Sequence, residues 1–312
     1  NIEEGVDDER LGIEKLFAHY DEVCDRLKIA GIYIDGKLEA FTMGELLNDN
    51  MALIHIEKAN PEIRGLYPYI NQQFLVHEFP DVEFVNREED MGIEGLRAIK
   101  KNLDWLDTFY QLGFRHASLT WNEENDLGTG AKGDENRGIT EVGKTTIKKM
   151  NELGMVVDVS HANEKTFWGI YETSTKPIIA SHSNARSLCD HVRNLTDEQI
   201  KAVAETGGLV GAVAYKGFVD LAKEKQTIER YVDHIDHMVS LVGVKHVGIG
   251  FDFCEYLHAN RTGKDMNPSG LEDASYAQNV IEELRKRDYS EEDIRKIAYE
   301  NFMRIIEVTL EK

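Results

Sequence analysis

Two histidines, His161 and His182, stand at the ends of short apolar runs that are typical of buried strands. The runs are residues 155–161 (MVVDVSH) and 177–183 (PIIASHS), and a helical pattern over 163–174 separates them. In a parallel α/β barrel, the C-terminal ends of the strands open onto the active-site face. Imidazoles at that position are well placed to bind zinc or a similar metal ion.

A third apolar run of the same kind, residues 246–253 (HVGIGFDF), ends with Asp252. A carboxylate close to a metal site can accept and return protons. Taken singly, each histidine is more commonly a residue that caps its strand by hydrogen bonds. The expected chemistry therefore depends on the three strand ends lying together.

The elements that position these residues follow one repeated order. From residue 102 onward, a strand followed by a helix recurs about five times, which predicts a parallel sheet in a barrel-like α/β fold. The predicted strands are 114–121, 155–161, 177–183, 209–215 and 246–253. The predicted helices are 103–113, 140–153, 163–174, 196–206, 228–242, 274–287 and 290–310.

The first hundred residues have a different pattern, which predicts an antiparallel α+β arrangement. Asp35-Gly36 between two apolar runs is a strong signal for a β-hairpin. The predicted helices are 7–27 and 61–79, and the predicted strands are 29–34, 38–43, 51–56 and 82–85.

Composition limits the classes of function. The chain has 312 residues and a net charge of −21, which opposes binding to nucleic acid or to anionic membrane surfaces. No apolar run approaches the roughly 18 residues that a membrane span requires. Three widely spaced cysteines, Cys24, Cys189 and Cys254, are typical of a reducing compartment. We therefore expect a cytoplasmic location.

Residues 41–74 (FTMGELLNDNMALIHIEKANPEIRGLYPYINQQF) and 82–101 (VEFVNREEDMGIEGLRAIKK) carry the first of two family resemblances. Over about 1–101 the chain resembles the C-terminal, GNAT-like acyltransferase-type domain of phosphatidylglycerol lysyltransferase-like proteins. The resemblance implies a cofactor pyrophosphate site at residues 57–66 (EKANPEIRGL). That segment has a single glycine, so the cofactor motif is degenerate.

From about residue 92 to the C-terminus, the chain resembles the membrane (renal) dipeptidase family of zinc peptidases. The matching segments are IEG (93–95), FYQLGFRHASLTWNEEN (109–125), MNELGMVVDVSHANEKTFW (150–168), KPIIASHSNARSLCDHVRNLTDEQI (176–200), YVDHIDHMVSLVG (231–243), VGIGFDF (247–253) and YENFMRII (299–306). This resemblance implies a (β/α) TIM-type barrel with two bridged zinc ions that cleaves dipeptides.

The resemblance also assigns roles to single residues. It implies that Glu94 bridges the two metal ions and that His161 and His182 bind the second one. It implies that Arg193 holds the substrate carboxylate and that Asp252 handles protons at the leaving amine. Trp121 occupies a position where some family members have a substrate-contacting histidine.

One part of the family pattern is missing. The resemblance implies an H-x-D strand, before Glu94, that binds the first metal ion. The only H-x-D match there is His19-Tyr20-Asp21, inside a helical pattern. Residues i and i+2 on a helix do not face each other. The barrel is therefore expected to be incomplete, with one of its two metal sites lost.

These observations predict a GNAT-like fragment over 1–91 and an incomplete dipeptidase-like barrel over 92–312. The predicted activity is dipeptide hydrolysis, weakened, with one or two zinc ions. A dipeptide is the expected partner and a homodimer is a candidate assembly; nucleic acid and a membrane span are not expected. The alternatives are a GNAT-type acyl- or aminoacyl-transferase and a non-catalytic chimeric chain.

Residues 138–145 (GITEVGKT) match the phosphate-binding expression GxxxxGK[ST]. A phosphate-binding loop must directly follow a strand and precede a helix. Here a long polar loop comes before the match, and helical periodicity already runs through Val142. We therefore interpret the match as the start of a helix.

Overall fold

The computed structural model describes residues 13–14, 16–18, 20–48, 51–82, 84–86, 104–111, 113–254 and 262–310. The chain divides into two compact units, Ile13–Phe114 and a second unit that contains Arg115–Lys312. The predicted domain boundary between residues 91 and 92 lies outside the described residues and stays a prediction.

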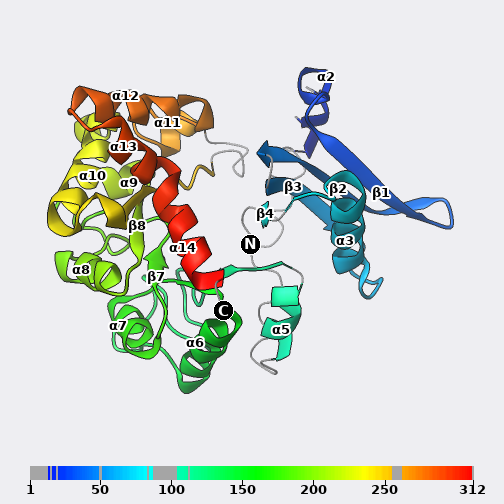
Figure 1. Cartoon of the computed structure of the whole chain (residues 1–312), viewed down its shortest axis with the longest axis horizontal. Helices are drawn as coiled ribbons and strands as arrows, with labels where there is room; N and C mark the ends of the chain where they lie inside the picture. Colours follow the sequence, from blue (N-terminus) through cyan, green and yellow to red (C-terminus); the bar gives the residue numbers. More distant parts are fainter. Residues whose placement is uncertain are drawn as a thin grey trace. The chain divides into compact units, whose positions relative to one another are not determined.

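The first unit is a four-stranded sheet with strand order β1-β2-β3-β4 and one long helix beside it (Figure 1). The elements are α2 (Tyr20–Val23), β1 (Lys28–Ile34), β2 (Lys37–Asn48), β3 (Met51–Ala59), α3 (Leu66–Glu78) and β4 (Phe84–Asn86), and α5 (Asp104–Gln111) follows.

The predicted hairpin is present in this unit. Asp35 and Gly36 have φ angles of 52° and 80°, which suit the tight turn between β1 and β2. The expectation of an entirely antiparallel pattern is wrong for the last pair, because β4 runs parallel to β3. The reason is that α3 forms a crossover connection, which returns the chain in the same direction. Phe74 of α3 packs edge-on against Phe79, with ring centroids 5.2 Å apart.

The second unit contains a five-stranded sheet with strand order β5-β6-β7-β8-β9. Every neighbouring pair is parallel. The strands are β5 (His116–Ser118), β6 (Val156–Asp158), β7 (Ile178–Ala180), β8 (Leu209–Ala212) and β9 (Val247–Ile249). The α/β fold class predicted from the sequence is thereby confirmed.

Helices follow the strands of this sheet and lie around it in Figure 1. They are α6 (Glu141–Leu153), α7 (Glu164–Thr173), α8 (Asp197–Glu205), α9 (Lys216–Val219), α10 (Ile228–Val242), α11 (Gly263–Met266), α12 (Gln278–Lys286), α13 (Glu291–Arg295) and α14 (Asn301–Leu310). α14 covers the sheet: Ile305 is buried with Val156, Ile179 and Leu209. No helix among the described residues is long and apolar enough to cross a membrane.

The GxxxxGK[ST] match lies across the start of α6. Thr140 is the N-cap, and its Oγ1 accepts a hydrogen bond of 3.1 Å from the backbone N–H of Gly143. The Nζ atom of Lys144 lies 2.8 Å from Glu141 Oε1. The Gly143 amide and the Lys144 side chain, which would hold a phosphate in a phosphate-binding loop, thus both contact residues at the start of α6. The match is the start of a helix, as interpreted from the sequence.

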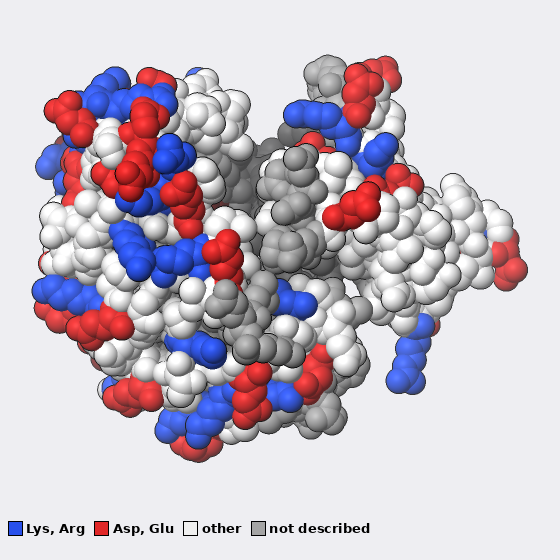
Figure 2. Space-filling view, in the orientation of Figure 1, with Lys and Arg blue, Asp and Glu red and all other residues white. Residues whose placement is uncertain are grey.

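Basic and acidic side chains are interspersed over the helices of the second unit (Figure 2). Arg287 is the centre of one network of ion pairs. Its guanidinium is 2.8 Å from Asp233, 2.5 Å from Asp236 and 3.1 Å from Glu283, and it donates to the carbonyl of Glu229 at 2.7 Å. These bonds join the end of α12 to α10.

Replacing Arg287 by alanine is expected to lower the free energy of unfolding by about 2–3 kcal/mol, because three partly buried carboxylates lose their shared cation. Urea denaturation measures this change. Arg295→Ala is the matched control, since Arg295 is 54% exposed and pairs only at the surface with Glu300. Its expected loss is below about 1 kcal/mol. Equal urea midpoints for the two variants would contradict the prediction.

Candidate active site

Three of the residues singled out in the sequence meet at the C-terminal ends of the parallel strands. His161 follows β6, His182 follows β7 and Asp252 follows β9. The Nε2 atoms of the two histidines are 2.8 Å apart. His182 Nε2 lies 4.0 Å from Asp252 Oδ2. The order of the strands in the sheet therefore brings together residues that are up to 91 positions apart, from 161 to 252.

The backbone is unusual at two of these residues. His161 and Asp252 have positive φ angles of 71° and 60°. The other two non-glycine residues with positive φ in the described part of the chain, Asp35 and Asp288, lie in a hairpin turn and directly after a helix. A left-handed conformation in a non-glycine residue costs of the order of 1–3 kcal/mol and is frequent at functional sites.

The Nδ1 atom of each imidazole lies within hydrogen-bonding distance of a side-chain oxygen. His161 Nδ1 lies 3.1 Å from Asn122 Oδ1, and His182 Nδ1 lies 2.8 Å from Ser181 Oγ. When both Nδ1 atoms donate to these oxygens, both Nε2 atoms present lone pairs to each other. Two lone pairs at 2.8 Å repel unless a proton or a metal cation lies between them.

The electrostatics of the site disfavour a second proton on either imidazole, so both rings are neutral. Burial, together with the nearby Arg193 guanidinium, lowers the pKa of His161 to about 2. Burial likewise lowers the pKa of His182 to about 4, although Asp158 acts in the opposite direction. Neutral imidazoles with free Nε2 lone pairs are the form that binds zinc. The donor atoms therefore fit a metal ion.

The predicted metal ligand Glu94 lies outside the described residues. Within residues 13–86 and 104–310, as far as they are described, no group of three or more His, Cys, Asp or Glu side chains could hold a metal ion. His161 and His182 thus form part of a ligand set that needs a further ligand.

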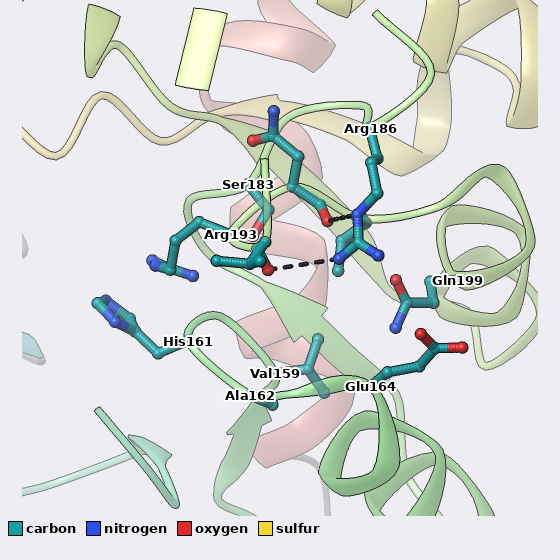
Figure 3. Close-up of a pocket in the computed structure, with 11 residues that line it drawn as sticks. Val159, His161, Ala162, Glu164, Ser183, Arg186, Arg193 and Gln199 are labelled. Atoms are coloured by element: carbon teal, nitrogen blue, oxygen red, sulfur yellow. Dashed lines mark hydrogen bonds between the residues drawn. The ribbon is translucent and has the colours of Figure 1, made fainter. Parts of the chain in front are cut away.

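Arg193 is almost completely buried, with 4% of its surface exposed. Arg193 lines a pocket together with His161, Glu164, Arg186 and Gln199. In Figure 3 the side chain of Arg193 extends toward His161, whereas Arg186 points to the opposite end of this pocket, near Glu164 and Gln199. Arg193 Nη2 has no hydrogen-bond partner among the described residues. Burial lowers the pKa of Arg193 to about 10, so the side chain remains charged at neutral pH. A buried, charged donor of this kind favours an anionic acceptor such as a carboxylate.

Trp121 lies beside the site and not within it. Its ring centroid is 6.2 Å from that of His161, and 65% of the residue is exposed. The next residue, Asn122, contributes the oxygen that contacts His161.

Sequence reasoning missed Asn122, Asp158 and Ser181. Asp158 carried a signal, because a charged residue inside the apolar run MVVDVSH must have buried partners. Ser181 stands directly before a predicted ligand. Asn122 directly follows the predicted strand 114–121, but it begins a long polar loop and lies far from His161 in the sequence.

Comparison with known proteins confirms both resemblances. The family model described as membrane dipeptidase (peptidase family M19) matches residues 79–311. The model described as phosphatidylglycerol lysyltransferase, C-terminal, matches residues 3–104.

Individual relatives agree with the first match. An uncharacterized dipeptidase of Schizosaccharomyces pombe is 36% identical over 70% of this chain and 52% of its own length. Dipeptidase aclJ of Aspergillus oryzae is 32% identical over 69% of this chain and 50% of its own length. The chain thus spans about half of these two relatives.

Solved structures give the same result. A metallo peptidase from Rhodobacter sphaeroides, liganded with a phosphinate mimic of the dipeptide L-Ala-D-Ala, is 30% identical with a TM-score of 0.59. The match covers 67% of this chain and 59% of that protein. Because the family model spans well over half of the residues, this chain belongs to the membrane dipeptidase family, peptidase family M19.

Proposed function

We propose that this chain is a zinc-dependent hydrolase of dipeptides that acts in the cytoplasm, with His161 and His182 as ligands of one zinc ion and Glu94 as a further ligand. The observation that carries the proposal is the 2.8 Å approach of two neutral imidazole Nε2 atoms whose Nδ1 atoms are both engaged elsewhere. Family membership supports the same chemistry.

When bound, zinc would supply a water molecule whose pKa is lowered to about 7. The chain's own residues supply the other parts of the reaction. Arg193 would bind the substrate carboxylate through its buried Nη2 atom and so orient the peptide bond. Asp252, whose Oδ2 is 4.0 Å from His182 Nε2, would move a proton to the nitrogen of the leaving amine.

The activity is expected to be weak. The H-x-D pair that the resemblance places before Glu94 would belong to the segment that matches the lysyltransferase model instead. Two residues of the H-x-D match at 19–21, Tyr20 and Asp21, lie in helix α2, and His19 lies outside the described residues. A site with one metal ion would then perform a reaction for which the family uses two.

Metal content tests the proposal. We expect elemental mass spectrometry of the purified chain to find roughly one zinc ion per molecule, because one set of ligands is retained. We expect His161→Ala/His182→Ala to lose it. His237→Ala/His246→Ala is the matched control, since these histidines contact Asp197 and the Gly208 carbonyl, away from the site.

The proposal is supported if the wild type and the control bind zinc and His161→Ala/His182→Ala does not. We also expect the zinc-bound wild type to hydrolyse a dipeptide such as Ala-Ala slowly. A chain without zinc overturns the proposal. Acyl transfer by the first unit would then be the remaining candidate function.

A further inference from the structure

Asp158, at the end of β6, is a buried carboxylate that accepts four hydrogen bonds. Its Oδ1 accepts from the backbone N–H groups of Ser160 at 2.8 Å and Ser181 at 3.0 Å. Its Oδ2 lies 2.5 Å from Ser181 Oγ and 3.1 Å from His116 Nε2. An ionised carboxylate offers about four lone-pair positions, so these partners occupy all of them.

Asp158 is therefore held in its ionised form. Burial alone would raise its pKa, but the hydrogen bonds from His116 and Ser181 outweigh burial and keep the pKa below its ordinary value. An ionised carboxylate can only accept hydrogen bonds, so the Ser181 hydroxyl must donate to it. The same hydroxyl is then left with lone pairs toward His182 Nδ1, 2.8 Å away.

Because the Ser181 hydroxyl donates to Asp158, it can only accept a hydrogen bond from His182, and this fixes the tautomer of His182. His182 must carry its proton on Nδ1 to donate to Ser181 Oγ, which leaves a lone pair on Nε2. His161 is less constrained, because its partner is the carboxamide of Asn122, which can present either an acceptor or a donor. Without metal, His161 can therefore place a proton on Nε2 and donate it to His182 across the 2.8 Å gap.

We propose that Asp158 and Ser181 are positioning residues: they hold His182 in the Nδ1-protonated tautomer, with the Nε2 lone pair directed at the metal position. The inference rests on the proposed function for the identity of the metal, but the tautomer itself is a property of the metal-free protein. Partners of this kind raise the affinity of a histidine for its metal by fixing the orientation of the ring.

The tautomer is measured by long-range ¹H–¹⁵N correlation NMR on metal-free protein labelled with ¹⁵N-histidine. His182→Gln identifies the His182 signals by their loss. We expect the wild type to show a protonated Nδ1 and an unprotonated Nε2 at His182. We expect Ser181→Ala to lose this preference, and Ser181→Thr, which keeps a hydroxyl, to retain it.

Zinc affinity is measured by competition with a chelator. We expect Ser181→Ala and Asp158→Asn to weaken zinc binding by about 10–100-fold. Ser187→Ala is the matched control, because Ser187 lies in the same loop but its hydroxyl contacts Asp197 and His237. We expect this control to bind zinc like the wild type.

The outcomes separate this inference from the proposed function. A wild type that binds no zinc overturns the proposed function, and the NMR result still decides the tautomer. If Ser181→Ala folds and keeps both the Nδ1-protonated form of His182 and the wild-type zinc affinity, the positioning role is wrong. If Ser181→Ala does not fold, the same two measurements on Asp158→Asn decide the question.

Discussion

Replacing Arg193 by methionine is expected to lower kcat/KM for a dipeptide by about 10²–10³-fold, equivalent to about 3–4 kcal/mol of transition-state stabilisation. Arg193 is 4% exposed and has a buried Nη2 atom without a partner among the described residues. A substrate carboxylate would complete its hydrogen bonds in surroundings with little water, where a charge-assisted bond is strong. Steady-state kinetics with zinc-loaded protein measures the change.

Two comparisons make this prediction specific. A dipeptide whose C-terminus is an amide lacks the carboxylate, so the wild type should handle it poorly and Arg193→Met should discriminate little between the two substrates. Arg186→Met is the matched control in the same pocket. The Arg186 guanidinium already donates to the carbonyls of Asn194 and Val192 and points away from His161 (Figure 3). Equal losses for both variants would show that Arg193 does not bind the carboxylate.

Stability separates a loss of binding from a loss of fold. Replacing Arg193 relieves the desolvation cost of a buried guanidinium whose Nη2 atom has no hydrogen-bond partner among the described residues, and methionine fills much of the same volume. Arg193→Met should therefore unfold in urea within about 1 kcal/mol of the wild type. A much larger loss would mean that Arg193 supports the loop itself, for example through its contact with Phe218, whose ring centroid is 5.5 Å away.

The periodicity of apolar residues was enough to predict most of the helices and strands, because the residues that are apolar in the sequence are the ones that each element buries. The run KPIIA becomes β7. The predicted helices 196–206 and 290–310 begin at the N-caps Thr196 and Ser290, whose side chains accept hydrogen bonds from the backbone of the first turn. The predicted strand after helix 61–79 also exists. Its parallel direction was not predictable from its own residues, since direction depends on how the chain passes over the sheet.

The candidate site could be predicted only in part. His161, His182 and Asp252 were recognisable because each ends an apolar run, and the parallel sheet then brings them together. Which residues orient them could not be predicted, although the charge of Asp158 inside an apolar run indicated that it has buried partners. Asp158 contacts a histidine 42 positions earlier and a serine 23 positions later, and Asn122 contacts a ring 39 positions later. Such pairs are formed by tertiary packing, which has no local pattern in the sequence.

A single methyl group at Gly250 is expected to lower the free energy of unfolding by about 3 kcal/mol and to weaken zinc binding at the same time. Gly250 follows β9, and a Cβ atom there would lie 1.8 Å from the carbonyl oxygen of Ser181 and 3.3 Å from the Cα of His182. Its φ angle is outside the left-handed region, so the expected effect of Gly250→Ala is steric.

The atoms that a Cβ at Gly250 would meet belong to the backbone of Ser181 and His182, which cannot move aside as a flexible side chain does. The end of β7 must therefore shift, and Ser181 and His182 shift with it. Gly217→Ala is the matched control, because the atoms nearest to its Cβ would be those of the Tyr215 side chain, from 3.0 Å, and alanine favours the helix α9 in which it lies. Urea denaturation and zinc titration of both variants test the prediction. Wild-type stability in Gly250→Ala would mean that the ends of β7 and β9 can separate without a loss of free energy. The geometry of the His161–His182 pair would then not depend on the close packing of these two strand ends.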